Sequence, residues 1–433
     1  MRMSKQEKKG LVPEQRFPEF RDAGEWQLLN GDNVFDQISN KYHNSDLPIL
    51  AITQEYGAIP REEINYHVSV TDKSIESYKV VETGDFIISL RSFQGGIEYS
   101  NYKGLCSPAY VILRKKIDVS NHFYKQFFKT NIFIQSMNKN IEGIRDGKMV
   151  SYKQFSELLL PYPFPNEQQK IADCFTSIDE LITTQTQKLE ALKTHKKGLM
   201  QYLFPAEGET VPRLRFPEFR DKGEWEVCSI EKLVYKEIIF PPKDGNHGNI
   251  HPKSSDYVEY GIPFVMANDI KNGNINLEGC SHISKAQADS LQKGFAKEGD
   301  VLFTHKGTVG EVAVINKIEF PYLMLTPQVT YYRVIKKESL LNKFLSFSFC
   351  SERFKNKLSE VSGGGTRAYI GITEQRKLVV VLPPELEEQQ KIADCLSSID
   401  ELITAQSQKL KSLMTHKKGL MQQLFPTIDE VNA

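Results

Sequence analysis

Only a few residues of this chain have the types and spacing of a catalytic site. Residues 146–148 read Asp-Gly-Lys, which is the Asp-x-Lys spacing of a nuclease, but no upstream acidic residue makes a convincing partner for it. His195 and His416 each lie in a Thr-His-Lys-Lys-Gly-Leu-Met segment near the expected end of a helix, where basic residues suit the helix dipole. We therefore interpret the Asp-x-Lys match as coincidence and both histidines as partner-facing or capping residues.

Patterns for cofactors and metals are also missing from the sequence. The Gly-Thr-Val-Gly segment at 307–310 lacks the spacing of a phosphate-binding loop, and there is no Asn/Asp-Pro-Pro-aromatic motif of a methyltransferase. The six cysteines are scattered without a Cys-x-x-Cys pair, which argues against a zinc site or a disulfide framework. No apolar run approaches the roughly 18–20 residues that span a bilayer. We expect a cytoplasmic protein with no catalytic residue, metal or cofactor of its own.

Several polar residues in the second half of the chain have the types that bind DNA. Asparagine, lysine and arginine can bond base edges or phosphates, and a glycine-rich loop brings the backbone close to a ligand. The alternative is that these residues belong to ordinary solvated turns. The candidates, with Asp244 beside the first of them, are Lys243, His247, Asn268, His305, Lys306, Thr366, Arg367 and Tyr369.

The first half of the chain offers parallel candidates at similar positions. The segment Ser-Leu-Arg-Ser at 89–92 is placed like Phe-Thr-His-Lys at 303–306, and Gly-Ile-Arg-Asp-Gly-Lys at 143–148 is placed like the triple-glycine segment at 362–367. The resulting candidates are Thr53, Gln54, Arg91, Ser92, Arg145, Lys148 and Tyr152.

The net charge of zero counts against nucleic-acid binding, but the charges are unevenly distributed. Residues 91–153 hold eleven bases and four acids, and residues 333–367 hold eight bases and three acids. Two basic stretches at corresponding places suit phosphate-facing surfaces, although lysine and arginine also simply solubilise helices.

An internal repeat determines how these candidates must be positioned. Residues 167–205 and 388–426 are identical at thirty-one of thirty-nine positions, and each copy is preceded by a tag, RFPEFRDAGEW at 16–26 and RFPEFRDKGEW at 215–225. The intervening residues 27–160 and 226–382 match only at scattered points such as Gly84-Asp85 and Gly299-Asp300. The framework is therefore duplicated, whereas the two variable regions differ.

The repeated segment predicts a long helix. Each copy follows a proline-rich stretch, contains no internal proline, ends at Leu-Phe-Pro and carries a broad apolar stripe. We expect the two helices, each roughly 55 Å long at 1.5 Å per residue, to pair as an antiparallel coiled coil with a pseudo-two-fold axis near Gln185 and Gln406. A parallel pair would also bring the two glutamines together, and each helix could instead pack on its own domain. The expected pairing residues are Ile171, Ile178, Leu181, Gln185, Leu192, Leu199, Ile392, Ile399, Leu402, Gln406, Leu413 and Leu420.

These features together resemble the specificity subunit of type I restriction–modification systems. The resemblance rests on the Glu-Gln-Gln-Lys-Ile-Ala-Asp helix repeated after two unlike regions, the RFPEFR tags, GIPFVMANDI at 261–270 and GDVLFTHKGTVGEVAVI at 299–315. It implies an α+β fold with two unlike α/β target recognition domains, each reading one half of a bipartite DNA site. It also implies two methyltransferase subunits and motor–nuclease subunits as partners. S-adenosylmethionine, ATP and Mg are then expected only in those partners.

The same organisation gives the expected boundaries. We expect, in order, an N-terminal tail, the first recognition domain, its spacer helix, a linker, the second recognition domain, its spacer helix and a C-terminal tail, at residues 1–15, 16–160, 161–205, 206–214, 215–382, 383–426 and 427–433. Because the variable regions differ, the expected target is asymmetric. Two alternatives are a self-contained methyltransferase or restriction enzyme, and a coiled-coil adaptor that binds proteins.

Overall fold

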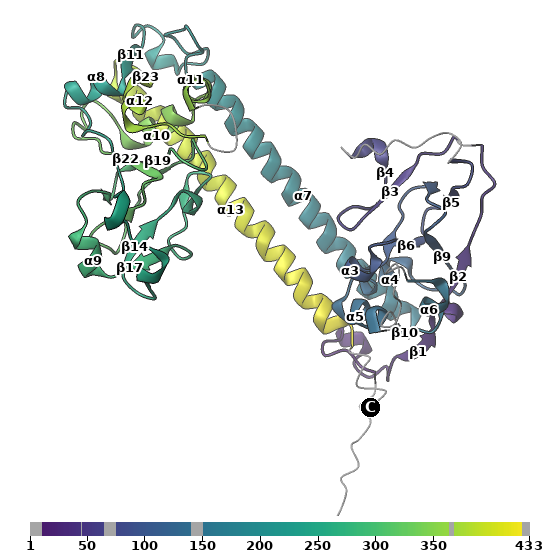
Figure 1. Ribbon diagram of the computed structural model, residues 1–433. Helices are drawn as coiled ribbons and strands as arrows, with labels where there is room; N and C mark the ends of the chain where they lie inside the picture. The colour runs from purple at the N-terminus through teal and green to yellow at the C-terminus, as the bar shows by residue number, and fades with distance from the viewer. Residues whose placement is uncertain (1–10, 45, 65–74, 140–149, 363–367, 427–433) are drawn as a thin grey trace, which may run out of the picture. The chain divides into compact units, whose positions relative to one another are not determined.

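The computed structural model divides the chain into two compact units, each containing one variable region and parts of both long helices (Figure 1). The first unit comprises residues 1–187 and 408–433, and the second comprises residues 188–407. The structure describes residues 11–44, 46–64, 75–139, 150–362 and 368–426. Within those ranges, no helix is both long and apolar enough to cross a membrane. The domain boundaries expected from the sequence stay predictions.

The first unit is built on a four-stranded antiparallel sheet covered by short helices. Its strand order is β2 (Phe35–Ile38), β9 (Val111–Lys115), β6 (Phe86–Ile88) and β7 (Glu98–Tyr99). Three strand pairs complete the unit: β1 (Gln27–Asn30) with β10 (Leu159–Tyr162), β3 (Leu50–Thr53) with β4 (Gly57–Pro60), and β5 (Lys79–Val81) with β8 (Gly104–Cys106). The helices are α1 (Gly31–Val34), α3 (Ser92–Gly95), α4 (Asn121–Phe127), α5 (Asn131–Lys139) and α6 (Tyr152–Ser156).

The second unit contains a four-stranded antiparallel sheet of the same kind. Its strand order is β12 (Lys243–Asp244), β22 (Val329–Tyr332), β19 (Val301–Thr304) and β20 (Val312–Val314). A five-stranded mixed sheet has no counterpart in the described part of the first unit, and its strands are β13 (Tyr257–Val258), β17 (Ser281–Ile283), β14 (Ile262–Val265), β21 (Leu323–Leu325) and β18 (Phe295–Ala296). Two further pairs are β11 (Glu226–Ser229) with β23 (Val379–Leu382), and β15 (Ile270–Lys271) with β16 (Asn274–Ile275). The helices are α8 (Ile230–Tyr235), α9 (Lys285–Ser290), α10 (Asn342–Cys350), α11 (Glu352–Ser362) and α12 (Ile372–Lys377).

Each unit encloses an aromatic-rich core that includes the end of a long helix. In the first unit, Phe425 stacks on Phe175 with ring centroids 5.9 Å apart and also contacts Phe123. In the second unit, Phe204 packs on Trp225 and Phe344. In each core, the start of one long helix and the end of the other therefore pack in a single hydrophobic cluster.

The two long helices begin a few residues after the starts expected at 161 and 383, and they end two residues before the ends expected at 205 and 426. α7 (Pro165–Leu203) has proline at its first position, where the missing N–H is no loss, and α13 (Leu386–Leu424) follows two prolines. Both end just before a Phe-Pro pair.

The helices run antiparallel, as expected. In the first unit, Lys417 of α13 forms an ion pair with Asp179 of α7 at 2.6 Å. In the second unit, Lys196 of α7 forms the corresponding ion pair with Asp400 of α13 at 2.5 Å. In both units the early part of one helix thus contacts the late part of the other, which excludes a parallel pair.

The Glu-Gln pair at the start of each repeat explains part of the sequence identity. Glu167 binds Arg16 of the first tag at 2.6 Å, while Gln168 accepts a hydrogen bond from the Ser120 backbone N–H at the start of α4. The second unit repeats this with Glu388 and Gln389, which bind Arg215 and the Leu341 N–H at the start of α10. The repeat therefore ties each long helix to its tag and to its variable region.

Candidate DNA interface

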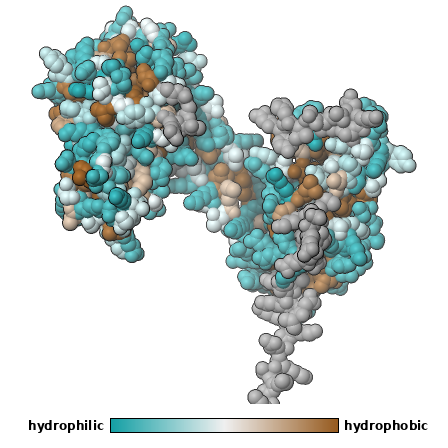
Figure 2. Space-filling view, viewed as in Figure 1, coloured by the Kyte–Doolittle hydropathy of each residue, from teal (hydrophilic) through white to brown (hydrophobic). Residues whose placement is uncertain are grey.

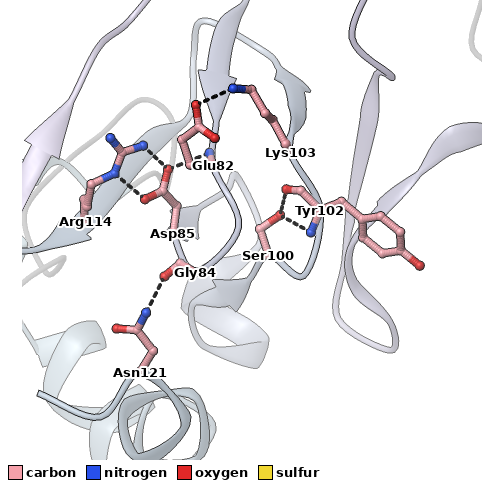
Figure 3. Close-up of polar contacts among 8 residues, drawn as sticks. All are labelled: Glu82, Gly84, Asp85, Ser100, Tyr102, Lys103, Arg114 and Asn121. Atoms are coloured by element: carbon pink, nitrogen blue, oxygen red, sulfur yellow. Dashed lines mark hydrogen bonds and ion pairs between the residues drawn. The ribbon is translucent and has the colours of Figure 1, made fainter.

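A buried aspartate fixes the turn that leads into the central strand β6 of the first unit (Figure 3). Gly84 takes a positive φ of 96°, and Asp85 accepts hydrogen bonds from the Glu82 N–H at 2.8 Å and from Arg114 Nε and Nη2, each at 2.7 Å. Asn121 at the start of α4 donates to the Gly84 carbonyl at 3.1 Å. The turn, strand β9 and helix α4 are therefore held together by one charged network.

The second unit repeats the aspartate–arginine part of this network around β19. Gly299 takes a φ of 86°, and Asp300 accepts from the Lys297 N–H at 2.7 Å and from Arg333 Nε and Nη2 at 2.8 and 2.7 Å. The sequence indicated only the Gly-Asp match. The arginine partners follow at different separations, 29 and 33 residues after the aspartates, which hid the rest of the motif.

The end of β6 brings two of the predicted first-half candidates together. Gln54 at the tip of the β3–β4 hairpin donates to the Arg91 carbonyl at 3.1 Å. Both side chains are exposed, whereas Ser92 is buried and its hydroxyl accepts from the Ser89 N–H at 2.9 Å. Thr53 closes the same hairpin tip by accepting from the Tyr56 N–H at 2.9 Å.

Two residues that sequence reasoning missed support the Arg91 segment. Lys129 donates to the Gly95 carbonyl at 2.9 Å, and Asn138 donates to the Phe93 carbonyl at 2.9 Å. Lys129 also pairs with buried Glu98 at 2.6 Å. Burial raises the pKa of Glu98 and lowers the pKa of Lys129. The attraction between the two charges therefore offsets only part of the cost of burying them. No pattern in the sequence links these residues to the loop.

At the end of β19, the His305 side chain is buried in the second unit, whereas the Lys306 side chain is exposed at its surface. His305 is 1% exposed, its Nδ1 lies 2.8 Å from the Thr330 hydroxyl, and its carbonyl accepts from the Ile370 N–H. Burial lowers the pKa of His305 to about 4, which keeps the ring neutral near pH 7. The expectation that His305 contacts DNA is therefore corrected, because the ring is enclosed by its own domain.

Lys306 and Tyr369 are neighbours at this surface. The two residues form an isolated antiparallel bridge, Lys306 is exposed and Tyr369 is 52% exposed. The structure thus joins the 303–310 segment to the segment that follows the triple glycine, as the sequence could not.

A third segment, at β12, adds His247 and Lys243. His247 Nε2 lies 2.6 Å from Asp244 Oδ2, and Lys293 pairs with the other oxygen of the same carboxylate. Burial raises the pKa of Asp244, but the hydrogen bonds from Lys293 and His247 outweigh it and leave the pKa below its usual value. The exposed Lys243 lies over the Phe240 ring at 5.1 Å.

The remaining candidates are dispersed. Asn268 is exposed on a short 3-10 helix, and Tyr152 is half-buried, with its hydroxyl donating to the Phe35 carbonyl at 3.0 Å. Four candidates lie outside the described residues: Arg145, Lys148, Thr366 and Arg367. Among the residues that are described, no group of three or more His, Cys, Asp or Glu side chains could hold a metal ion.

The predicted helix-pairing residues differ in burial. Ile171, Ile178, Ile392, Ile399 and Gln406 are buried, whereas Gln185, Leu192, Leu199, Leu413 and Leu420 are half-buried. Leu181 and Leu402, which occupy the same position in the two repeats, are 50% and 55% exposed. The repeat therefore leaves a leucine at the surface at the same position of both copies.

Comparisons with known proteins agree on one family. Residues 26–194 and 217–414 match the family model described as type I restriction modification DNA specificity domain. The type I restriction enzyme MjaVIII specificity subunit of Methanocaldococcus jannaschii is 25% identical over 425 residues, covering 93% of this chain and 92% of the relative. A type I restriction–modification S subunit from M. genitalium has a similar fold, with a TM-score of 0.57, 14% identity, and coverage of 96% of this chain and 99% of that one.

Proposed function

This chain belongs to the family of type I restriction–modification specificity subunits, and we propose that it reads a bipartite, asymmetric DNA site with one variable region for each half. Members of this family are non-catalytic; they recognise DNA and work with methyltransferase and restriction subunits. The observation that supports an asymmetric site is that both units have the Asp–Arg network but carry different exposed residues around it. Residues 16–160 would read one half-site and residues 215–382 the other.

Among the described residues we infer the DNA-facing ones from their exposed or half-exposed side chains, several of them at the ends of β6 and β19, whereas Arg145, Lys148, Thr366 and Arg367 are assigned from the sequence alone. In the first region we assign this role to Gln54, Arg91 and the adjoining Thr53, together with Arg145 and Lys148. In the second region the assigned residues are Lys243, His247, Asn268, Lys306 and Tyr369, together with Thr366 and Arg367. Ser92, Tyr152 and His305 are left out because their polar atoms are bonded inside the protein.

The partners implied by this reading are two methyltransferase subunits and the motor–nuclease subunits. Hydrophobic side chains occur among the surface atoms of the molecule (Figure 2), and among the described residues Leu402 of α13 and Leu181 of α7 are 55% and 50% exposed at the same position of the two repeats. Two exposed leucines at equivalent positions suit two copies of one partner. Base flipping and methyl transfer would fall to that partner, which would hold S-adenosylmethionine, while ATP and Mg would serve the motor–nuclease. The complex would act in the cytoplasm.

Mapping methylated bases tests this function. Host DNA is sequenced with and without this chain, with its methyltransferase partner present in both cases. A split, asymmetric motif that disappears without the chain is expected. Exchange of residues 27–160 for those of another specificity subunit should then change one half of the motif and leave the other intact.

Other outcomes separate the rival functions. Methylation or cleavage by the purified chain alone would indicate a self-contained enzyme. Unchanged methylation with a partner that is otherwise active would overturn the reader function and favour a protein-binding adaptor.

A further inference from the structure

We propose that Arg91 and Lys306 are equivalent phosphate anchors, which bind the DNA backbone and set the register of each variable region without reading bases. This inference rests on the proposed DNA-reading function and goes beyond it, because it assigns two residues of unlike regions one common role. Three features of the structure support it: an equivalent position, a fixed backbone and an unpaired charge.

The equivalence follows from the shared network. Each residue lies six positions after the buried aspartate, Arg91 after Asp85 and Lys306 after Asp300. The two strands that follow these aspartates, β6 and β19, pair with their neighbouring strands β9 and β22 in the same register. Phe86 of β6 pairs with Leu113, the residue before Arg114, and Val301 of β19 pairs with Tyr332, the residue before Arg333.

This register corrects the alignment suggested by the sequence. With Asp85 placed on Asp300, Leu90 corresponds to His305 and Arg91 to Lys306. In this alignment, Arg91 and Lys306 are the basic residues at the same position after the central strand of each region. Its neighbours on either side differ in type.

The backbone at this position is fixed in both regions. In the first region the Arg91 carbonyl accepts from Gln54, and the Arg91 N–H donates to the Ser89 hydroxyl at 3.3 Å. In the second, Lys306 is bridged to Tyr369, and the Thr304 hydroxyl closes the loop by accepting from the Glu311 N–H at 2.9 Å. A fixed backbone reduces the entropy lost when the side chain is immobilised on a ligand.

The two charges are available for a ligand. Across the described ranges, neither Arg91 nor Lys306 forms an ion pair, and both are exposed. Other basic residues nearby are engaged, since Arg114, Arg333 and Lys293 each bind a buried aspartate. Arg91 and Lys306 therefore keep their charges available for a ligand, whereas Arg114, Arg333 and Lys293 stabilise the fold through their ion pairs.

Phosphate is the partner chemistry that suits a shared position. The half-sites read by two unlike regions differ in base sequence, whereas both contain the same sugar–phosphate backbone. Contacts to phosphate position a protein on the duplex, and contacts to base edges specify the sequence. A cation fits the positioning role on phosphate when it lies at the same position of a common framework and its neighbouring residues differ.

The test uses Arg91→Ala and Lys306→Ala in the complex with the methyltransferase partner. Binding is measured across a salt series to a duplex with the mapped motif and to a duplex with the motif scrambled. Affinity for both duplexes should fall by the same factor, about tenfold at low salt. The slope of log affinity against log salt should decrease by about 0.9 for each variant. The conservative exchanges Arg91→Lys and Lys306→Arg should restore both quantities and leave the methylated motif unchanged.

Arg21→Ala and Arg220→Ala are matched controls, because they remove an exposed charge at equivalent positions of the two tags. They should leave the salt slope unchanged. A relaxed or altered half-motif in Arg91→Lys or Lys306→Arg would show base reading and overturn the inference, as would unchanged affinity in both alanine variants. If the unaltered complex fails to distinguish the two duplexes, the proposed function itself is wrong.

Discussion

Arg215 holds Glu388 through two parallel hydrogen bonds, of 2.8 and 2.7 Å, with side chains that are only 5% and 1% exposed. A third hydrogen bond, from Arg215 to the Gly223 carbonyl at 2.7 Å, links the two ends of the tag. The same arrangement joins Arg16 to Glu167 and to Gly24 in the first unit. The tag is thus an anchor for the start of each long helix, and its role is structural in both copies.

Removing one member of this pair should destabilise the second unit strongly. Glu388→Gln leaves the buried guanidinium without its counter-charge, and such a change typically costs about 3–5 kcal/mol. Denaturant unfolding of the variant measures the loss. Glu218→Gln is the control, because Glu218 pairs with Lys391 at the exposed surface and its loss should leave the unfolding free energy nearly unchanged. Equal effects of the two variants would contradict a structural role for the buried pair.

The Asp–Arg networks predict damage confined to one variable region. Asp300→Asn removes the charge that binds Arg333, and Asp85→Asn does the same for Arg114. Each should weaken its own sheet by roughly 2–4 kcal/mol, because a buried charged hydrogen bond is lost. Amide hydrogen exchange should therefore rise in β22 for the first variant and in β9 for the second. Equal exchange in both strands with either variant would argue against independent networks.

The sequence predicted the long helices well because their determinants are local. Prolines lie just before each repeat, and the unbroken apolar period and the closing Phe-Pro lie within it. The Lys417–Asp179 contact confirms the antiparallel pairing. The networks at Asp85 and Asp300 were not predictable in the same way. Their arginines come from a strand 29 or 33 residues away, and the spacing differs between the two halves.

The candidate interface was predicted only in part, for a related reason. Residue type selected Arg91 and Lys306, which are exposed, and also His305 and Ser92, which the structure buries. Burial at the end of a strand depends on which segment covers it, here Ile370 and Thr330 around His305. That information is tertiary and has no local pattern.

The ion pair between Lys417 and Asp179 should contribute measurably to helix pairing in the first unit. Asp179→Lys places two cations together and also removes the acceptor of Gln126, so it should destabilise the unit. The double variant Asp179→Lys with Lys417→Asp should recover part of the loss. Because both side chains are partly exposed, we expect a coupling energy of about 0.5–1 kcal/mol from a double-mutant cycle. A coupling energy near zero would mean that apolar contacts alone hold the helices together.

Stability of the second unit should depend on pH through His305. Burial lowers its folded-state pKa to about 4, with Asp244 opposing the shift and His247 and Lys306 adding to it. The unfolded chain, with an ordinary histidine pKa, binds the proton more readily. The contribution is therefore fully present above about pH 6.5 and is lost as pH falls toward 4, by up to about 3 kcal/mol.

The His305→Asn variant isolates this contribution, because asparagine can keep a hydrogen bond to Thr330 without titrating. Thermal unfolding between pH 8 and pH 4.5 should show a steeper loss of Tm in the unaltered chain than in the variant. Parallel curves would mean that His305 titrates normally in the folded state.

Leu181 and Leu402 should matter for assembly and little for folding. Each leaves about half of its side chain exposed at the same position of its repeat, so serine at either site removes little buried apolar area. On the proposed function, each leucine contacts one methyltransferase subunit. Leu181→Ser should then leave Tm unchanged and lower the number of bound methyltransferase subunits from two to one, measured by light scattering or native mass spectrometry. The double variant should bind none at concentrations that saturate the unaltered chain.

Ile178→Ser is the contrasting change, because Ile178 is buried and its loss should lower Tm. Full binding by the double variant would exclude these leucines from the docking surface.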